Sequence, residues 1–166
     1  ANDHQAASMF DSDDGKELPT LVPSSFTVNM GQIENQEIRL YANDGSTWFT
    51  DDGVWFDLRH EDDTPSDGVG VVLKQEFVEA NTVKPQGREQ LSHNSNFFYG
   101  NDESEWKTRV GNFKEAWYDD IWMGVDLRYH ITESGLKYDL IVNPGGDVNQ
   151  IKIRYQGAQG LRIDDG

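Results

Sequence analysis

Residues 125–142 read VDLRYHITESGLKYDLIV, and this stretch decides the fold class. Apolar side chains occupy every second position over 125–131 and again over 136–142. This alternation places the apolar residues on one face of each segment, as in a half-buried β-strand. Thr132–Gly135 lies between the two segments and has turn composition. The sequence therefore predicts an antiparallel β-hairpin here.

The same alternation recurs nearer the N-terminus. Residues 37–42, 47–50 and 54–58 predict three strands of a meander, joined by the turn sequences Asn43-Asp44-Gly45 and Asp51-Asp52-Gly53. In the third strand, Trp55 lies on the face opposite the apolar set.

Further short strands are predicted over 69–78 and 151–155, with a last one around Leu161 and Ile163. Residues 79–95 match neither regular period, so we expect a loop with an irregular strand there. Roughly nine or ten short strands without a substantial helix indicate an all-β fold, an antiparallel β-sandwich or open barrel.

A chain of 166 residues is the size of one domain. Residues 1–25 have no period and are expected to form an irregular N-terminal arm. Residues 26–166 are expected to form a single β-sandwich domain. Its C-terminus lies at a turn, so we expect either an excised fragment cut short at its C-terminal strand or an edge left open for a neighbour.

Composition excludes several classes of function. Thirty acidic residues against 14 basic ones give a net charge of −16, which argues against a nucleic-acid partner bound through phosphates. No apolar run is long enough for membrane insertion by a helix. The absence of cysteine excludes disulfides, thiolate metal sites and cysteine nucleophiles.

Two acidic clusters are candidate metal sites. Asp11, Asp13 and Asp14 could converge on calcium, a cation that prefers carboxylate oxygens. The EF-hand register fails, however, because Val22 stands where a bidentate carboxylate is required, and a solvated acidic arm is the alternative. The run from His60 to Asp63 could suit zinc or manganese, with a solvated loop as the alternative.

The chain carries no catalytic signature. It has no Gly-x-Ser-x-Gly elbow. The carboxylates with aromatic surroundings are candidates for a glycosidase pair, although turn and edge acids are the alternative; they are Glu105, Asp119, Asp120 and Asp126. We therefore expect no enzymatic activity.

Five tryptophans could form a platform on which a sugar stacks. The candidate ligand-binding residues are Trp48, Trp55 and Trp106. Packing in the core or at its rim is the alternative for each of them.

Several blocks of sequence together resemble a known family. They are Phe26–Gln32, Ile38–Ala42, Trp48–Val54, Asn96–Asp102, Gly124–Tyr129, Leu136–Val142, Pro144–Asp147 and Tyr155–Ala158. In this order they resemble a domain of unknown function found at the N-terminus of large extracellular proteins with SBBP-type β-propeller repeats. The resemblance implies a non-catalytic, secreted or cell-surface module and carries over no site residues.

Three hypotheses for function follow. The first is a structural or adhesive module of a larger secreted or cell-surface protein, whose partners are the other domains of that protein or neighbouring subunits. The second is a carbohydrate-binding module for glycans, stabilised by calcium or independent of it. The third is a subunit of an extracellular assembly formed by strand exchange.

Overall fold

The computed structural model describes residues 24–58 and 71–157, and its elements there are strands and two single 3-10 turns. The strands are β1 (Phe26–Val28), β2 (Leu40–Ala42), β3 (Thr47–Thr50), β4 (Gly53–Leu58), β5 (Val71–Phe77), β6 (Gln86–Phe97), β7 (Lys107–Trp122), β8 (Val125–Thr132), β9 (Gly135–Val142) and β10 (Ile153–Gln156). The turns are η1 (Glu103–Glu105) and η2 (Val148–Gln150). No helix in the described ranges is long and apolar enough to cross a membrane.

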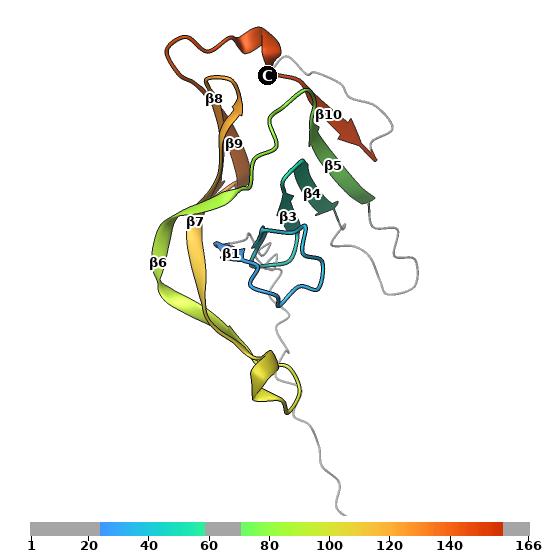
Figure 1. Cartoon of the computed structure of the whole chain (residues 1–166), viewed down its shortest axis with the longest axis vertical. Helices are drawn as coiled ribbons and strands as arrows, with labels where there is room; N and C mark the ends of the chain where they lie inside the picture. The colour runs from blue at the N-terminus through green and yellow to red at the C-terminus, as the bar shows by residue number, and fades with distance from the viewer. Residues whose placement is uncertain (1–23, 59–70, 158–166) are drawn as a thin grey trace, which may run out of the picture.

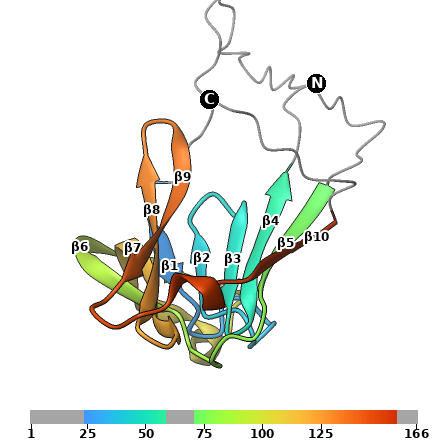
Figure 2. The same cartoon turned by 90° about the horizontal axis from the view of Figure 1, so that it is seen from above.

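All ten strands belong to one antiparallel sheet, which confirms the all-β prediction in its open-barrel form. The strand order is β10-β5-β4-β3-β2-β1-β7-β8-β9, and β6 pairs with β7 off this path. Figure 1 shows the long β6–β7 hairpin beside the meander. Figure 2 shows the sheet curled, with β8 and β9 in one arm, β5 and β10 in the other, and β1 to β3 between them.

The predicted meander and C-terminal hairpin are present with bounds close to those expected. Residues 79–95 form a loop followed by most of β6, an irregular strand of twelve residues, as expected. The pairing of β6 with β7 shifts register between Gln90 and Asn94 and again between Ser95 and Phe97. Each irregularity interrupts the two-residue period by which a strand is recognised in a sequence.

The core lies on the inner, concave face of the curled sheet. Phe49 of β3 is fully buried and makes edge-on ring contacts with Phe26 at 5.3 Å and Tyr129 at 5.1 Å. Val54 of β4 is buried beside them. Inner residues from strands far apart in the sequence thus pack the two arms of the sheet together.

A chain of side-chain hydrogen bonds ties the two arms together across the interior. The hydroxyl of Tyr129 in β8 donates to Gln75 in β5, and the Gln75 amide donates to the Tyr155 hydroxyl in β10 at 2.9 Å. The hydroxyls of Tyr155 and Tyr138, from β10 and β9, lie 3.3 Å apart. Burial is the largest of the causes that raise the pKa of Tyr155 to about 12.

One row of paired residues crosses the outer, convex face of the sheet. From β7 to β10 the successive partners are Asn112, Thr27, Tyr41, Trp48, Trp55, Lys74 and Gln156. Its members in β7, β1 and β2 are buried, whereas Trp55 in β4 is 36% exposed. The row therefore becomes open to solvent at β3 and β4, where it carries two tryptophans.

Candidate functional site

The meander brings together two of the three predicted ligand-binding residues, Trp48 and Trp55. They are direct cross-strand partners in β3 and β4. The turn between the strands is held by the Thr50 hydroxyl, which donates to Asp52 Oδ1 at 2.7 Å and to the Gly53 carbonyl at 2.9 Å. The short turn fixes the pairing register, and so the two indoles emerge side by side on the outer face.

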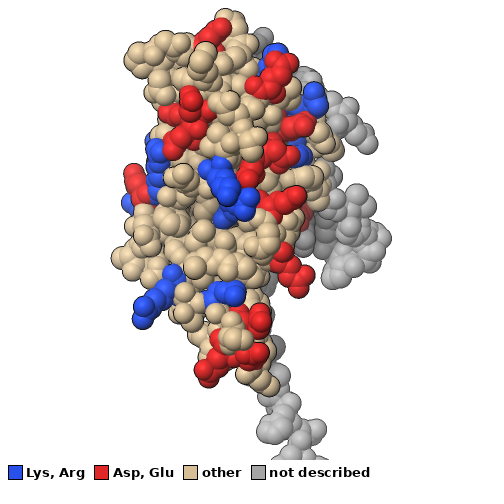
Figure 3. Space-filling model, in the orientation of Figure 1, with Lys and Arg blue, Asp and Glu red and all other residues tan. Residues whose placement is uncertain are grey.

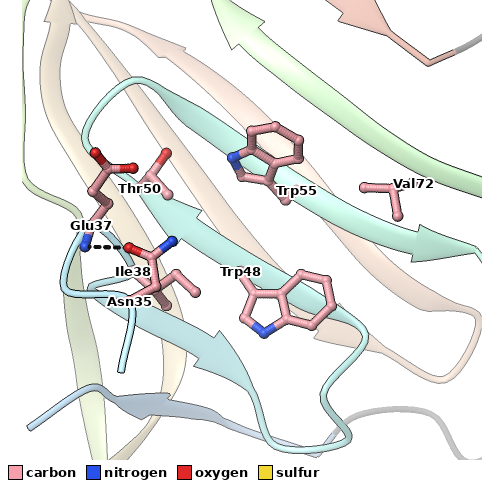
Figure 4. A pocket seen from close by; sticks show the side chains of 7 residues that line it. All are labelled: Asn35, Glu37, Ile38, Trp48, Thr50, Trp55 and Val72. Atoms are coloured by element: carbon pink, nitrogen blue, oxygen red, sulfur yellow. Dashed lines mark hydrogen bonds between the residues drawn. The ribbon is translucent and has the colours of Figure 1, made fainter. Parts of the chain in front are cut away.

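The two indoles line a hollow of about 260 Å³ (Figure 4). Its lining residues are Asn35, Glu37, Ile38, Trp48, Thr50, Trp55 and Val72. Figure 4 shows Glu37 and Thr50 on one side of the hollow, Val72 on the other, and the indoles between them. The site combines an apolar aromatic floor with polar groups along one side, which is the usual composition of a small-ligand site.

The indole N–H groups of Trp48 and Trp55 have no acceptor among the described residues. The Lys74 ammonium lies 5.1 Å from the centroid of the Trp55 ring, a cation–π contact. Two aromatic rings with unused donors can therefore offer both stacking area and hydrogen bonds to a ligand.

The loop between β1 and β2 supplies the polar side of the hollow. The Asn29 amide holds this loop in shape, since its nitrogen donates to the carbonyls of Ile33 at 3.1 Å, Asn35 at 3.2 Å and Ile38 at 3.0 Å. The Asn29 side-chain oxygen accepts from Gly31 N at 3.0 Å, and Gly31 has a φ of +103°, which suits glycine. The recognisable Asn29 and Gly31 positions of the sequence thus shape the loop that borders the site.

A second hollow, of about 290 Å³, adjoins the first and shares Glu37 and Thr50 with it. Its other lining residues are Arg39, Asp51 and Asp52. Arg39 Nε and Nη2 each donate to the Asp51 carboxylate at 2.9 Å, and this interaction lowers the pKa of Asp51. Both hollows together form a surface that is aromatic at one end and charged at the other.

The carboxylate of Asp52 is also engaged within the chain. Lys74 Nζ donates to Asp52 Oδ2 at 2.7 Å, which is the largest cause of the lowered pKa of Asp52. Lys74 therefore binds a carboxylate of the second hollow while it contacts the Trp55 ring of the first.

The structure does not bring Trp106 to this site. Its ring packs edge-on against Phe98 at 5.1 Å, beside η1 at the tip of the β6–β7 hairpin. Its Nε1 is buried and has no hydrogen-bond partner among the described residues. Trp106 is therefore part of a separate aromatic cluster, which fits the packing alternative for this residue and leaves Trp48 and Trp55 as the candidates that lie together.

The carboxylates considered for a glycosidase pair make structural contacts or stand alone. Asp119 pairs with Arg88, and Asp126 accepts from the backbone N–H of Asp120 at 2.7 Å. Asp120 in turn accepts from Gly124 N at 2.6 Å, so both residues shape the turn between β7 and β8. Glu105 lies exposed in η1.

The predicted metal ligands lie outside the described residues. This is so for Asp11, Asp13 and Asp14 and for the run from His60 to Asp63. Within the described ranges, no group of three or more His, Asp or Glu side chains could hold a metal ion. Calcium binding stays a prediction.

Sequence reasoning missed most of the residues around the indole pair. Thr50 follows Trp48 by two positions and thus shares its face, and Val72 stands two positions before Lys74 on the outer face. Strand alternation could have found both. No local signal marks Asn35, Glu37 or Ile38, because the folded β1–β2 loop brings them to the strands.

Comparison with known proteins identifies the family. Residues 26–166 match the family described as Domain of unknown function (DUF7948), and the chain belongs to it. No curated protein and no solved structure matches the chain. The expected link to proteins with SBBP-type repeats stays a prediction.

Proposed function

We propose that this domain is a non-catalytic, adhesive module that binds carbohydrate on the outer face of β3 and β4, as part of a secreted or cell-surface protein. The observation that carries the proposal is the cross-strand pair Trp48 and Trp55, which lines an open hollow and whose indole N–H groups have no acceptor among the described residues. The apolar face of a pyranose ring stacks on such a surface, and its hydroxyls find polar groups at the edge.

The surroundings of the pair support a neutral or cationic saccharide. The chain has a net charge of −16, which repels anionic ligands. Figure 3 shows acidic side chains spread over one face of the molecule and gathered at the η1 end, where Asp102, Glu103 and Glu105 are exposed. A non-catalytic role is supported by the structural contacts of Asp119, Asp120 and Asp126.

The proposal is tested by titrating the protein with neutral oligosaccharides, including cello- and chito-oligosaccharides, while tryptophan fluorescence and heat are recorded. We expect saturable binding, and we expect Trp48→Ala and Trp55→Ala each to weaken it by about tenfold, which corresponds to roughly 1.4 kcal/mol. Trp117→Ala is the matched control, because Trp117 lies on β7 away from the hollow.

Two results would contradict the proposal. Flat titrations with unchanged fluorescence across the panel would remove the carbohydrate site. Turnover of the oligosaccharides by the wild-type protein, abolished by substituting a carboxylate, would show that the module is an enzyme.

A further inference from the structure

The charged end of the site limits which saccharide it can hold. The two hollows share Glu37 and Thr50, and so a ligand on the indoles lies next to the charged groups of the second hollow. Three carboxylates border this surface, at Glu37, Asp51 and Asp52, together with the cations Arg39 and Lys74. A third cation, Lys84, lowers the pKa of Asp51 by its charge, and the charge of Glu37 raises the pKa of Arg39, so the three carboxylates face three cations.

Of these three carboxylates, Glu37 is the one that no described cation holds by a hydrogen bond. Arg39 is engaged with Asp51 and Lys74 with Asp52, each through hydrogen bonds of 2.9 Å or shorter. The Glu37 carboxylate accepts no hydrogen bond from any described residue. Figure 4 shows it on the Thr50 side of the hollow, at the border of the aromatic floor.

The aromatic floor itself accepts a cation. Lys74 already places its ammonium 5.1 Å from the centre of the Trp55 ring. An indole face attracts cations through its quadrupole and repels anions for the same reason. Lys74 already contacts the Trp55 ring, so the Glu37 carboxylate and the ring of Trp48 are the two groups that favour a cationic group on a ligand in the hollow.

We propose that the preferred ligand is an amino saccharide of the glucosamine type, whose free primary amine binds Glu37 while its ring lies on Trp48 and Trp55. This inference rests on the proposed carbohydrate site and specifies its ligand class. A protonated amine forms an ion pair with Glu37, in which donor and acceptor are both charged, whereas the acetamide N–H of an N-acetylated sugar is a neutral donor. Saccharides that carry carboxylates or sulfates are disfavoured by the same groups.

The test compares oligosaccharides of equal length that differ in charge. Glucosamine, N-acetylglucosamine and galacturonic acid tetramers are titrated into the protein at pH 6, where a primary amine is protonated. We expect the glucosamine tetramer to bind roughly fivefold to tenfold more tightly than the acetylated one, and the galacturonic acid tetramer most weakly. Raising the salt concentration should reduce the preference for the amine.

Glu37→Gln separates the role of this residue from that of the aromatic floor. The substitution should remove the preference for the amine, so that the variant binds the glucosamine and the acetylated tetramers with equal affinity. Glu34→Gln is the matched control, since Glu34 is an exposed acid of the same loop that does not line either hollow. It should retain the preference.

The outcomes distinguish this inference from the function on which it rests. Equal affinity of the wild-type protein for the amino and acetylated tetramers would overturn the inference and leave the carbohydrate site intact. A preference that survives in Glu37→Gln would overturn the assignment to Glu37. Failure of every tetramer to bind would overturn the inference and the proposed function together.

Discussion

Trp117 and Trp55 lie on the same outer face of the curled sheet. Among the described residues, the indole N–H of Trp117 has a hydrogen-bond acceptor and that of Trp55 has none. The Trp117 N–H donates to Glu115 at 2.6 Å, and the Arg88 guanidinium lies 4.3 Å from the ring centre. Trp55 has the Lys74 ammonium at 5.1 Å, an unused N–H among the described residues, and a hollow beside it.

The difference in hydrogen-bond partners indicates how a tryptophan with a structural role can be distinguished from one that is available for binding. Arg88 is itself held by Asp119, and the Trp117 N–H is held by Glu115, so the indole donor of Trp117 is engaged within the chain. The Trp55 surroundings keep donors and ring area free in the folded protein. The two positions have the same residue type and the same face of the sheet, but they lie on different strands and their interaction partners differ.

Replacing Phe49, which lies beneath Trp48 and Trp55 on the inner face, should have the largest effect on the free energy of unfolding. Phe49 lies in β3 next to Trp48 but on the opposite, fully buried face. We expect Phe49→Ala to lower the free energy of unfolding by about 3–5 kcal/mol, because it leaves a cavity in the core. Urea denaturation measures this. A decrease in the free energy of unfolding below about 1 kcal/mol would mean that the sheet beneath Trp48 and Trp55 is loosely packed. The exposure of Trp55 would then not distinguish a binding residue from a poorly packed one.

Alkaline pH should act mainly through the buried tyrosines of the inner face, although burial also raises the pKa of Tyr41 in the outer row. Burial raises the pKa of Tyr155 to about 12 and those of Tyr118 and Tyr129 well above their usual value of 10.0. The unfolded chain therefore loses these protons first as pH rises. Stability should be intact below about pH 10 and decline progressively as the pH approaches 12. Urea midpoints at pH 8, 10.5 and 11.5 check this, and constant midpoints would contradict it.

The two outer tryptophans should differ in their contribution to stability. We expect Trp117→Ala to lower the free energy of unfolding by about 1–2 kcal/mol, through loss of the Glu115 hydrogen bond and the contact with Arg88. Trp55→Ala should cost less than about 1 kcal/mol, since the ring contact with Lys74 is its main polar interaction. Thermal and urea unfolding of both variants measure the difference. Equal decreases in the free energy of unfolding would contradict the distinction between Trp117 and Trp55.

Acid should lower the free energy of unfolding equally through the Arg39–Asp51 pair near Trp55 and the Arg128–Asp139 pair near Trp117, and this effect should be the smallest of the four. Hydrogen bonds from Arg39 and Arg128 lower the pKa values of Asp51 and Asp139 below the usual 3.8. Their contributions are present above that pH and are lost as the pH falls through the lowered values. Asp51→Asn and Asp139→Asn should each cost at most about 1 kcal/mol at pH 7 and less at pH 2.5. Unfolding curves at both pH values decide whether the pairs are equivalent.

Part of the fold could be predicted because its strands alternate without interruption. The meander of β2 to β4 and the hairpin of β8 and β9 are of this kind, and their turns carry recognisable residues. The β6–β7 hairpin could not be predicted in full. Glu89 and Arg109 adopt positive φ values of 54° and 58°, and the register shifts between the two strands change which residues share a face.

The candidate site divides in the same way. Outward placement of Trp55 follows from alternation in β4, and the short turn places Trp48 opposite it. The separation of Trp106 from this pair depends on the course of the β6–β7 hairpin, for which the sequence had no regular period. Glu37 reaches the hollow only because Asn29 folds its loop, a long-range consequence that no local pattern contains.

The turn between β3 and β4 constrains how this surface can change among related chains. Thr50 pairs with Gly53, so only Asp51 and Asp52 separate the two strands. Inserting one residue there would shift one strand by a single position and turn its tryptophan toward the interior, unless a bulge absorbed the extra residue. A lineage that keeps both indoles outward can therefore lengthen this turn only in steps of two residues or with a compensating bulge, and we expect insertions to accumulate elsewhere.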